Sequence, residues 1–500
     1  MTVRLHELMR ELPGRLPPED PEVTGVAHDS RRVGPGDLFV AIAGEHADGR
    51  RFAGQAAAGG AVAVMGAEPA PPGLRVPWVA VEDPRALVGP LAVRVYGRPH
   101  ARLLLVAVTG TNGKSTVTRL IARVLEAAGR PAGFGGTLGY RFAGRDYASP
   151  GGGGRPRTTL EACDLVRALA EMARDGAAAA CLEASSHGLA LGRVDALEFD
   201  LAVFTNLTRD HLDFHGDLES YFAVKRRLFT DYLKPAGRAV IGVGDDWGRR
   251  LAGELAAAGV PVVTWGEDDG DVRAASAELD LAGIRARLVT PRGELAVASP
   301  LIGRFNLLNV LAAVAVAEAL ELEPAAAVRG IAAEGPLPGR LEPVRAGQDF
   351  PVFVDYAHTP GALAAALGSL RELSARRIAV VFGCGGERDR GKRPEMGRIA
   401  GEHADLAIVT SDNPRGEDPE AILDAVEVGL RQSGGRYRRV TDRRAALREA
   451  VEVAASGGAP GWMVLAAGKG HEQVQLVGES RIPFSDRREL EAALARSGNA

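Results

Sequence analysis

The segment TGTNGKST, residues 109–116, brings two glycines, a lysine and several hydroxyl side chains into one short stretch. Gly110 and Gly113 would let the backbone wrap closely around a ligand. Lys114 could neutralise outer phosphates, and the Ser115 hydroxyl could ligate Mg²⁺. A turn that leads from a strand into a helix directs backbone N–H groups and a helix N-terminus at one point, which suits a phosphate. We therefore expect this segment to bind the triphosphate of ATP or GTP.

Further polar groups follow two other apolar runs. Residues 177–184 (AAAACLEA) lead to Glu183, and residues 201–206 (LAVFTN) lead to Asp210 and His211. In open α/β sheets function collects at the carboxyl ends of the strands. A carboxylate there could take Mg²⁺ directly or through water, so Glu183 and His211 are candidate site residues.

Two patterns in the same half of the chain stay open on sequence alone. HLDFH, residues 211–215, places two histidines four apart, which could face one metal on a helix. Asp213 and His215 could equally be capping groups at a polar helix start. Asn306 and Asn309 lie in an otherwise apolar helix start and need partners, either the edge of a base or a neighbouring backbone group.

The C-terminal third carries charged groups in several loops. They are Asp355 and His358 in VDYAHTP, Arg388, Arg390, Lys392 and Arg393 in FGCGGERDRGKRP, Asn413 and Arg415 in SDNPRGEDP, and Lys469, His471 and Glu472 in AAGKGHEQ. Pro414 favours an extended Asn413, and the guanidinium fork of Arg415 matches a carboxylate. The run 388–393 could also be an ordinary solvated loop.

These groups must be positioned by strands and helices, and the chain is rich in both patterns. Residues 103–108 (LLLVAV) predict a buried strand, and the apolar spacing that follows at 117–125 predicts a helix. Val108 stands where the pattern GxxxxGK[ST] requires its first glycine. Strand and helix patterns alternate through the chain, which predicts an α/β protein with mostly parallel sheets. We expect three domains, at residues 1–98, 99–335 and 336–500.

Composition narrows the class of protein. The chain has 500 residues and a net charge of −4, which gives no overall basic field for nucleic acid. The three cysteines are widely spaced and form no disulfide framework pattern. No run is long and apolar enough for a membrane span, and the first residues lack a signal-peptide core. We expect a cytoplasmic protein without nucleic-acid partners.

Taken together, the motifs resemble those of the Mur ligases of bacterial cell-wall synthesis, over about residues 23–487. They are DSRRVGPGDLFVAIAGEHADGRRF, TGTNGKST, EASSHGL, FTNLTRDHLDFHG, GRFNLLN, PGRLEPV, VDYAHTP, FGCGGERDRGKRPEMG, DNPRGEDP, GKGHE and FSDR. The resemblance implies the three-domain Mur ligase architecture, with an N-terminal domain for the UDP substrate, a central P-loop domain for ATP and a Rossmann-like C-terminal domain for the amino acid.

The resemblance also implies an activity. Similar members join meso-2,6-diaminopimelate to the γ-carboxylate of D-glutamate in UDP-N-acetylmuramoyl-L-alanyl-D-glutamate, through an acyl phosphate and with cleavage of ATP to ADP and phosphate. The implied partners are these small-molecule substrates. The protein would be a monomer that acts in peptidoglycan synthesis. The implied cofactors are ATP, Mg²⁺ and a carbamate, derived from CO₂, on Lys225.

The site residues carried over from the family form four sets. For ATP they are Gly110, Thr111, Asn112, Gly113, Lys114, Ser115, Thr116, Asn306, Arg340 and Asp355. For the UDP substrate they are His28, Ser30, Glu45, His46, Ala47, Arg157, Thr158, Thr159, Ser185, Leu191 and Arg193. For the amino acid they are Arg388, Asp412, Asn413, Pro414, Arg415, Gly468 and Glu472. For magnesium they are Ser115, Glu183, His211 and carbamylated Lys225, and the catalytic set is Lys114, Glu183, His211 and Lys225.

The acceptor amino acid is the finest of these expectations. Diaminopimelate carries a distal carboxylate that lysine lacks, and Arg415 with Arg388 could pair it. Ligation of L-lysine is the alternative. Folylpolyglutamate synthesis is a more remote one, because such enzymes lack the domain that carries DSRRVGPGDLFVAIAG, residues 29–44. A nucleotide-binding protein without catalysis is disfavoured because Glu183, His211 and Lys225 are all present.

Overall fold

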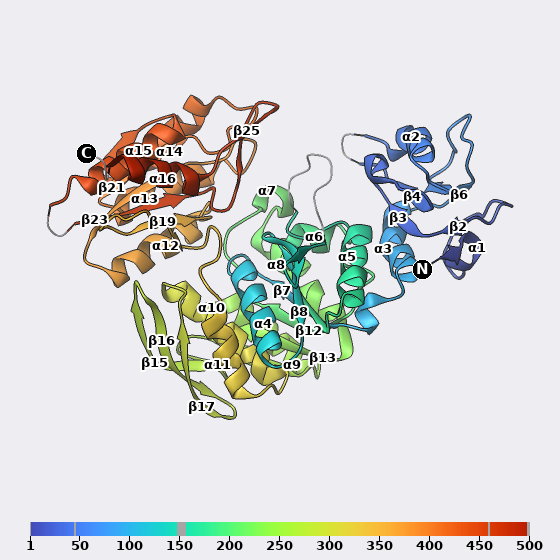
Figure 1. The fold of residues 1–500 in the computed structure, drawn as a ribbon, viewed down its shortest axis with the longest axis horizontal. Coiled ribbons are helices and arrows are strands. Elements are labelled where there is room, and N and C mark those ends of the chain that lie inside the picture. Colours follow the sequence, from blue (N-terminus) through green and yellow to red (C-terminus); the bar gives the residue numbers. More distant parts are fainter. Residues whose placement is uncertain (1, 45–46, 148–156, 459–460, 498–500) are drawn as a thin grey trace.

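The computed structural model describes residues 2–44, 47–147, 157–458 and 461–497. The N-terminal, central and C-terminal elements follow one another across the molecule, from blue through green to red (Figure 1). A parallel sheet with the strand order β3-β4-β5-β6 comes first. The elements of this part are β1 Val3–Arg4, α1 Leu5–Leu8, β2 Glu22–Val23, β3 Gly25–Ala27, β4 Asp37–Ala41, α2 Ala53–Ala58, β5 Ala63–Gly66, β6 Trp78–Ala80 and α3 Pro84–Val95.

The central sheet has the strand order β10-β9-β8-β11-β7-β12-β13-β14. The six strands β8, β11, β7, β12, β13 and β14 are parallel. Strands β9 and β10 add an antiparallel edge beside β8. The elements are β7 Leu104–Thr109, α4 Lys114–Ala127, β8 Ala132–Gly136, β9 Gly139–Phe142, β10 Arg145–Asp146, α5 Ala162–Arg174, β11 Ala179–Glu183, α6 Ser186–Ala190, β12 Phe199–Phe204, α7 Leu212–His215, α8 Leu218–Thr230, β13 Leu233–Gly242, α9 Asp246–Ala257 and β14 Val262–Trp265. Because β11 and β12 flank β7, the loops after them flank the loop after β7.

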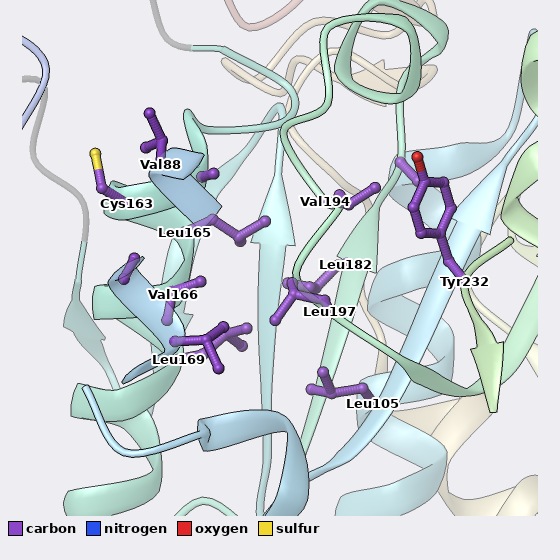
Figure 2. Close-up of a cluster of buried hydrophobic side chains, with 14 of the residues drawn as sticks. Val88, Leu105, Cys163, Leu165, Val166, Leu169, Leu182, Val194, Leu197 and Tyr232 are labelled. Carbon is purple, nitrogen blue, oxygen red and sulfur yellow. The ribbon is translucent and has the colours of Figure 1, made fainter. Parts of the chain in front are cut away.

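Strand alternation divides the central core into two layers. Leu105 packs into the cluster that contains α5 and α3, whereas its neighbour Val106 packs into the cluster that contains α4 and α10. Figure 2 shows the first layer, in which Leu105 and Leu182 of the sheet lie opposite Leu169 of α5. Both faces of the sheet are therefore buried, as a parallel sheet requires.

The second face also carries an antiparallel sheet and two helices. These elements are β15 Arg273–Asp280, β16 Gly283–Thr290, β17 Gly293–Ser299, α10 Arg304–Ala319 and α11 Pro324–Ala333. Helix α10 is buried along nearly its whole length, since it packs between α4, the edge of the central sheet and the antiparallel sheet. This explains why its sequence is apolar on all sides rather than amphipathic.

The C-terminal sheet has the strand order β18-β19-β23-β20-β21-β22, and its strands are parallel except β18. Helices α12, α13 and α14 cover one face, and α15 and α16 cover the other. The elements are β18 Glu342–Pro343, β19 Val352–Asp355, α12 Pro360–Leu373, β20 Arg377–Phe382, α13 Lys392–His403, β21 Leu406–Val409, α14 Pro419–Ser433, β22 Tyr437–Arg439, α15 Arg443–Ala455, β23 Trp462–Ala467, β24 Val474–Val477, β25 Ser480–Pro483 and α16 Asp486–Ser497.

The predicted fold class is confirmed: the molecule is α/β, with a mostly parallel central sheet and a doubly wound C-terminal sheet. The three apolar runs singled out in the sequence, at residues 103–108, 177–184 and 201–206, overlap β7, β11 and β12. The sequence reading missed β8, which is glycine-rich, and the antiparallel strands β15–β17. Within the described ranges, no helix combines the length and apolar character needed to cross a bilayer.

The three cysteines are buried and free of disulfides. Cys163 lies on α5, Cys181 on β11 and Cys384 just after β20. Burial raises the pKa of the Cys163 thiol to about 12 and that of the Cys384 thiol to about 11, and it also raises the pKa of Cys181. All three therefore remain neutral thiols at physiological pH.

The packing of α10 predicts the effect of Leu311→Ala. Leu311 is 0% exposed, and truncation would leave a cavity between α10 and the central sheet. We expect the free energy of unfolding to fall by about 2–5 kcal/mol in urea denaturation. Val428→Ala, on a side chain that is 47% exposed, is the control and should change it by less than about 0.5 kcal/mol. Equal losses would contradict the role of α10.

Candidate functional site

The glycine-rich turn that we expect to bind phosphate lies between the end of β7 at Thr109 and the start of α4 at Lys114. We call it the phosphate-type turn. Gly110 has φ +143° and Gly113 has φ +85°, a region that side chains disfavour. A Cβ at Gly110 would lie 1.9 Å from Thr205 Oγ1, and one at Gly113 would lie 2.5 Å from Asn309 Oδ1. The turn therefore has no room for a side chain at either position, and its backbone stays close to both neighbours.

Two lysines converge on this turn. Lys114 Nζ donates to the carbonyl oxygen of Gly110 at 3.0 Å, and Lys225 Nζ, from α8, donates to the same oxygen at 2.8 Å. Lys225 is 1% exposed. Burial and the neighbouring charge of Lys114 lower the pKa of Lys225 well below its usual value, and burial also lowers the pKa of Lys114. The lowered pKa of Lys225 favours the neutral amine over the ammonium.

The loop after β12 supports the turn from the other side. Thr111 N donates to Asn206 O at 2.8 Å, and Asn112 N donates to Asn206 Oδ1 at 3.0 Å. Thr205 Oγ1 donates to Asn112 O at 2.6 Å. Thr205 and Asn206 were missed as site residues in the sequence, although their position at the end of a predicted strand was the available signal.

Glu183, the last residue of β11, is held from the adjacent strand β8. Its carboxylate accepts from Thr137 N at 2.8 Å and from Thr137 Oγ1 at 3.1 Å, and Glu183 is 3% exposed. The hydroxyl of Thr137 also lies 3.0 Å from that of Thr158. Thr137, which the sequence reading missed, therefore links a predicted metal ligand to a predicted substrate-binding residue.

His211 begins α7 in the left-handed conformation, with φ +54°. Its Nε2 lies 3.4 Å from Asp210 Oδ2, and its ring packs edge-on against His187 with centroids 4.8 Å apart. Burial lowers the pKa of His211 to about 3, so its imidazole is neutral and can offer a lone pair to a metal. His215 also packs against His187, with ring centroids 5.8 Å apart.

The side chains of Asn306 and Asn309 form a hydrogen bond with each other. Asn309 Nδ2 donates to Asn306 Oδ1 at 2.9 Å, and Asn306 Nδ2 donates to Ile302 O at 2.8 Å, so partners within the chain satisfy part of both amides. Their position beside Gly113 places them next to the phosphate-type turn.

Arg340 and Asp355 come from the start of the C-terminal part. Arg340 Nη2 donates to Ser115 Oγ at 3.2 Å and so reaches across to α4. Asp355 accepts from the backbone N–H groups of Leu341 at 2.7 Å and Ala357 at 2.8 Å. Thr116, which follows Ser115 in α4, is buried. Seven of the ten residues predicted for ATP, Gly110 to Thr116, are thus one continuous turn.

The residues predicted for the UDP substrate fall into two groups. His28 and Ser30 follow β3, and Ser30 Oγ donates to Gln55 Oε1 at 2.9 Å. His28 Nδ1 lies 3.2 Å from Cys163 Sγ, and burial lowers the pKa of His28. Glu45 and His46 lie outside the described residues, and Ala47 is exposed beside them.

A cavity of about 330 Å³ lies next to this loop, at the carboxyl ends of β4, β5 and β6. It is lined by Ala41, Ile42, Ala43, Asp48, Arg50, Ala67, Glu68, Glu82, Asp83, Pro84 and Arg85. Its lining includes four acidic residues and two arginines. Arg50 forms an ion pair with Asp48 at 2.6 Å.

The second group of predicted UDP-substrate residues surrounds Glu183. Thr159 Oγ1 donates to Glu183 O at 2.8 Å and lies 3.0 Å from Ser185 Oγ. Arg193 Nη1 donates to Thr159 O at 3.1 Å, and Arg193 also pairs with Glu161. Arg157 pairs with the same carboxylate, and Leu191 ends α6 nearby as its C-cap.

Most residues predicted for the amino acid meet at the carboxyl ends of β21 and β23. Asn413 Nδ2 donates to Glu472 Oε2 at 2.8 Å. A Cβ at Gly468 would lie 2.6 Å from Asp412 Oδ2. Arg415, next to Pro414, has φ +55° and donates to Gly386 O. Arg388 is exposed and follows Gly386, whose N–H donates to Asn413 O at 3.0 Å.

Family models match the chain in three segments: the Mur ligase family catalytic domain at residues 22–96, the Mur ligase middle domain at 108–317 and the Mur ligase glutamate ligase domain at 339–470. The chain belongs to the Mur ligase family.

Two relatives of this Mur ligase, from Solibacter usitatus and Gloeobacter violaceus, are both named UDP-N-acetylmuramoyl-L-alanyl-D-glutamate-2,6-diaminopimelate ligase. Each is 44% identical to it; the first match covers 95% of both chains and the second covers 99% of this chain and 98% of the relative. A solved structure described by the same name has a TM-score of 0.68 and 35% identity, with both chains covered completely.

The crowding at Gly110 predicts that Gly110→Ala weakens nucleotide binding by this Mur ligase. The added methyl group would collide with Thr205 Oγ1, and the positive φ would be strained. We expect ATP affinity, measured by calorimetry, to fall at least about tenfold, the effect of misplacing a preorganised site. Gly253→Ala in α9, which meets no atom within 4 Å, is the control and should bind ATP normally. Normal binding by Gly110→Ala would contradict the assignment.

Proposed function

We propose that this Mur ligase joins meso-2,6-diaminopimelate to the γ-carboxylate of D-glutamate in UDP-N-acetylmuramoyl-L-alanyl-D-glutamate, with cleavage of ATP. The observation that carries the ligase chemistry is the convergence of Lys114 and Lys225 on Gly110 O. The names of the relatives, 44% identical over nearly the whole chain, support the choice of substrates.

In the proposed reaction, the D-glutamate carboxylate attacks the γ-phosphorus of ATP to give an acyl phosphate and ADP. The turn 110–116 would bind the phosphates through its backbone N–H groups, and Lys114 would offset the repulsion between two anions. The amine of the incoming amino acid then displaces phosphate and leaves an amide. Arg340, which already reaches Ser115, would hold the C-terminal part over the turn and help exclude water.

The donor set around the turn fits Mg²⁺. The Glu183 carboxylate and the Ser115 hydroxyl are oxygen donors, and a neutral His211 adds a nitrogen. When bound, Mg²⁺ would stabilise the charge on the phosphoryl oxygens. Thr137, which donates twice to Glu183, would hold that carboxylate in one orientation.

An unmodified Lys225 fits this metal set poorly, because an ammonium repels a cation. The pKa of Lys225, lowered by burial and by Lys114, favours the neutral amine that can attack CO₂. The reaction forms one C–N bond and releases one proton, and it leaves an anionic carbamate with two oxygens. We propose this carbamate as the fourth magnesium ligand.

The cavity beside β4, β5 and β6 would take the UDP portion. Arg50 and Arg85 could face the diphosphate, and the carboxylates could accept from ribose hydroxyls and the uracil N–H. His28 and Ser30 follow β3, the strand next to β4. Thr158, Thr159, Ser185 and Arg193, with Arg157 and Leu191 beside them, would hold the sugar and dipeptide near Glu183.

At the acceptor end, Arg415 would pair the distal carboxylate of diaminopimelate, with Asn413, Gly468 and Glu472 around its distal ammonium. Asp412 and Pro414 complete this loop, and the exposed Arg388 follows Gly386, which bonds to it. Lysine would leave Arg415 without that carboxylate. The match of residues 22–96 to a Mur ligase family model argues against folylpolyglutamate synthesis.

We also propose that the enzyme is a cytoplasmic monomer, where ATP and UDP-linked precursors are available. Its neutral thiols suit a reducing compartment. Sedimentation at assay concentration would test the oligomeric state.

The acceptor assignment predicts the outcome of a direct assay. The protein is incubated with ATP, Mg²⁺ and UDP-N-acetylmuramoyl-L-alanyl-D-glutamate, with either meso-diaminopimelate or L-lysine as the acceptor. Phosphate release and product mass should show ligation of diaminopimelate, with kcat/KM for lysine lower by about 10²-fold or more, because a missing charged partner costs about 2–5 kcal/mol. Preference for lysine would overturn the acceptor, and no product with either would overturn the ligase.

The carbamate assignment predicts that Lys225→Ala lowers kcat by at least about a hundredfold, the scale of losing one preorganised electrostatic group. Removal of CO₂ and bicarbonate should lower the wild-type rate, and native mass spectrometry should detect the mass of one CO₂ on Lys225. A small carboxylate such as acetate should partly restore Lys225→Ala, since it can occupy the vacated space. An active, unmodified wild-type enzyme would refute the carbamate.

A further inference from the structure

Lys469 is a fully buried lysine in the turn after β23, and its side chain is 0% exposed. Its ammonium donates to Asn413 Oδ1 at 3.0 Å, to Glu472 Oε2 at 2.9 Å and to Val474 O at 2.9 Å. A lysine ammonium has three N–H donors and accepts nothing. All three donors are therefore used inside the protein, and Lys469 has none left for a ligand.

The three acceptors come from three different segments. Asn413 lies in the loop after β21, Glu472 in the turn after β23, and Val474 begins β24. One ammonium therefore joins the two loops that carry the proposed acceptor site to the hairpin β24–β25.

The contacts of Lys469 fix the orientation of the Asn413 amide. Asn413 Oδ1 accepts from Lys469 Nζ and also from Leu476 N at 3.0 Å. Its Nδ2 must then face Glu472 Oε2, to which it donates at 2.8 Å. An amide turned by 180° would set its NH₂ group against two donors, which is unfavourable.

Glu472 is oriented by the same contacts. Its Oε2 accepts from both Asn413 and Lys469. Among the described residues, none forms a hydrogen bond with its Oε1, and the side chain is 30% exposed. That oxygen is the one available to an ammonium of a bound molecule.

The hairpin also holds the loop that carries Arg415. Arg415 N donates to Leu476 O at 3.0 Å, Gly478 N donates to Arg415 O at 2.7 Å, and Gln475 Nε2 donates to Asp412 O at 2.8 Å. The backbone of residue 415 is thus paired to β24 as a strand would be. The guanidinium and the Glu472 carboxylate are consequently set relative to one another by one element.

We propose that Lys469 is a positioning residue for acceptor recognition, which orients Asn413 and Glu472 so that the pocket reads both charges at the distal centre of a diamino diacid. Glu472 Oε1 receives the distal ammonium, and Arg415 receives the distal carboxylate. This inference rests on the proposed function. Lys469 acts by orienting its partners and not by filling space. A methionine of similar length would fill the same space but could not donate the hydrogen bonds.

Lys469→Met tests the proposal, with wild type and Lys234→Met as references. Lys234 pairs with Asp200 on the central sheet, away from the acceptor loops, so this variant makes the same chemical change elsewhere. For Lys469→Met we expect the KM for meso-diaminopimelate to rise about tenfold or more, the effect of losing a charge-assisted contact. The KM values for ATP and the UDP-dipeptide, and thermal unfolding, should stay near those of Lys234→Met.

A proportional loss for all three substrates, or an unchanged KM for diaminopimelate, would overturn the positioning role. Should Lys469→Met fail to fold, Lys469→Gln decides instead, because its shorter neutral amide keeps a donor but cannot meet all three acceptors. It should raise the KM for diaminopimelate alone, by about threefold, and no change would overturn the proposal. Wild type that makes no product with diaminopimelate would instead overturn the proposed function, which keeps the two failures distinct.

Discussion

Two amines that share one carbonyl oxygen are the constraint on which the rest of the site depends. Lys114 and Lys225 both donate to Gly110 O, although like charges in a buried place repel. Burial and the charge of Lys114 lower the pKa of Lys225, which eases this conflict. That arrangement requires Gly110 to lack a side chain, the loop after β12 to hold the turn, and α8 to present Lys225 from the far side. The strand order, with β7 between β11 and β12, supplies these neighbours.

Much of this arrangement could be predicted from the sequence. The buried strands were visible as apolar runs, and polar residues at their ends were expected to gather because parallel strands end at one edge. Glu183, Lys114 and the loop at 413–415 were found in this way. The fold class followed from the alternation of strand and helix patterns, because each pattern is local.

What could not be predicted depends on contacts between distant segments. Thr137 holds Glu183 across 46 positions of sequence, and Lys469 holds Asn413 across 56, so neither role leaves a local pattern. β8 was missed because a strand of Ala, Gly and Phe lacks the β-branched residues typical of strands. The Asn306–Asn309 bond gives these amides a side-chain partner that composition alone could not identify, since partner choice needs coordinates.

The buried cysteines have a practical consequence. Because Cys163 and Cys181 lie in the central layers and Cys384 lies after β20 in the C-terminal sheet, each thiol is shielded while its own sheet remains closed. An alkylating reagent can modify them only after local opening, when the thiol reaches solvent and can ionise. The three native cysteines can therefore report on local opening. The site and rate of alkylation would tell which sheet opens first and whether bound nucleotide slows the opening.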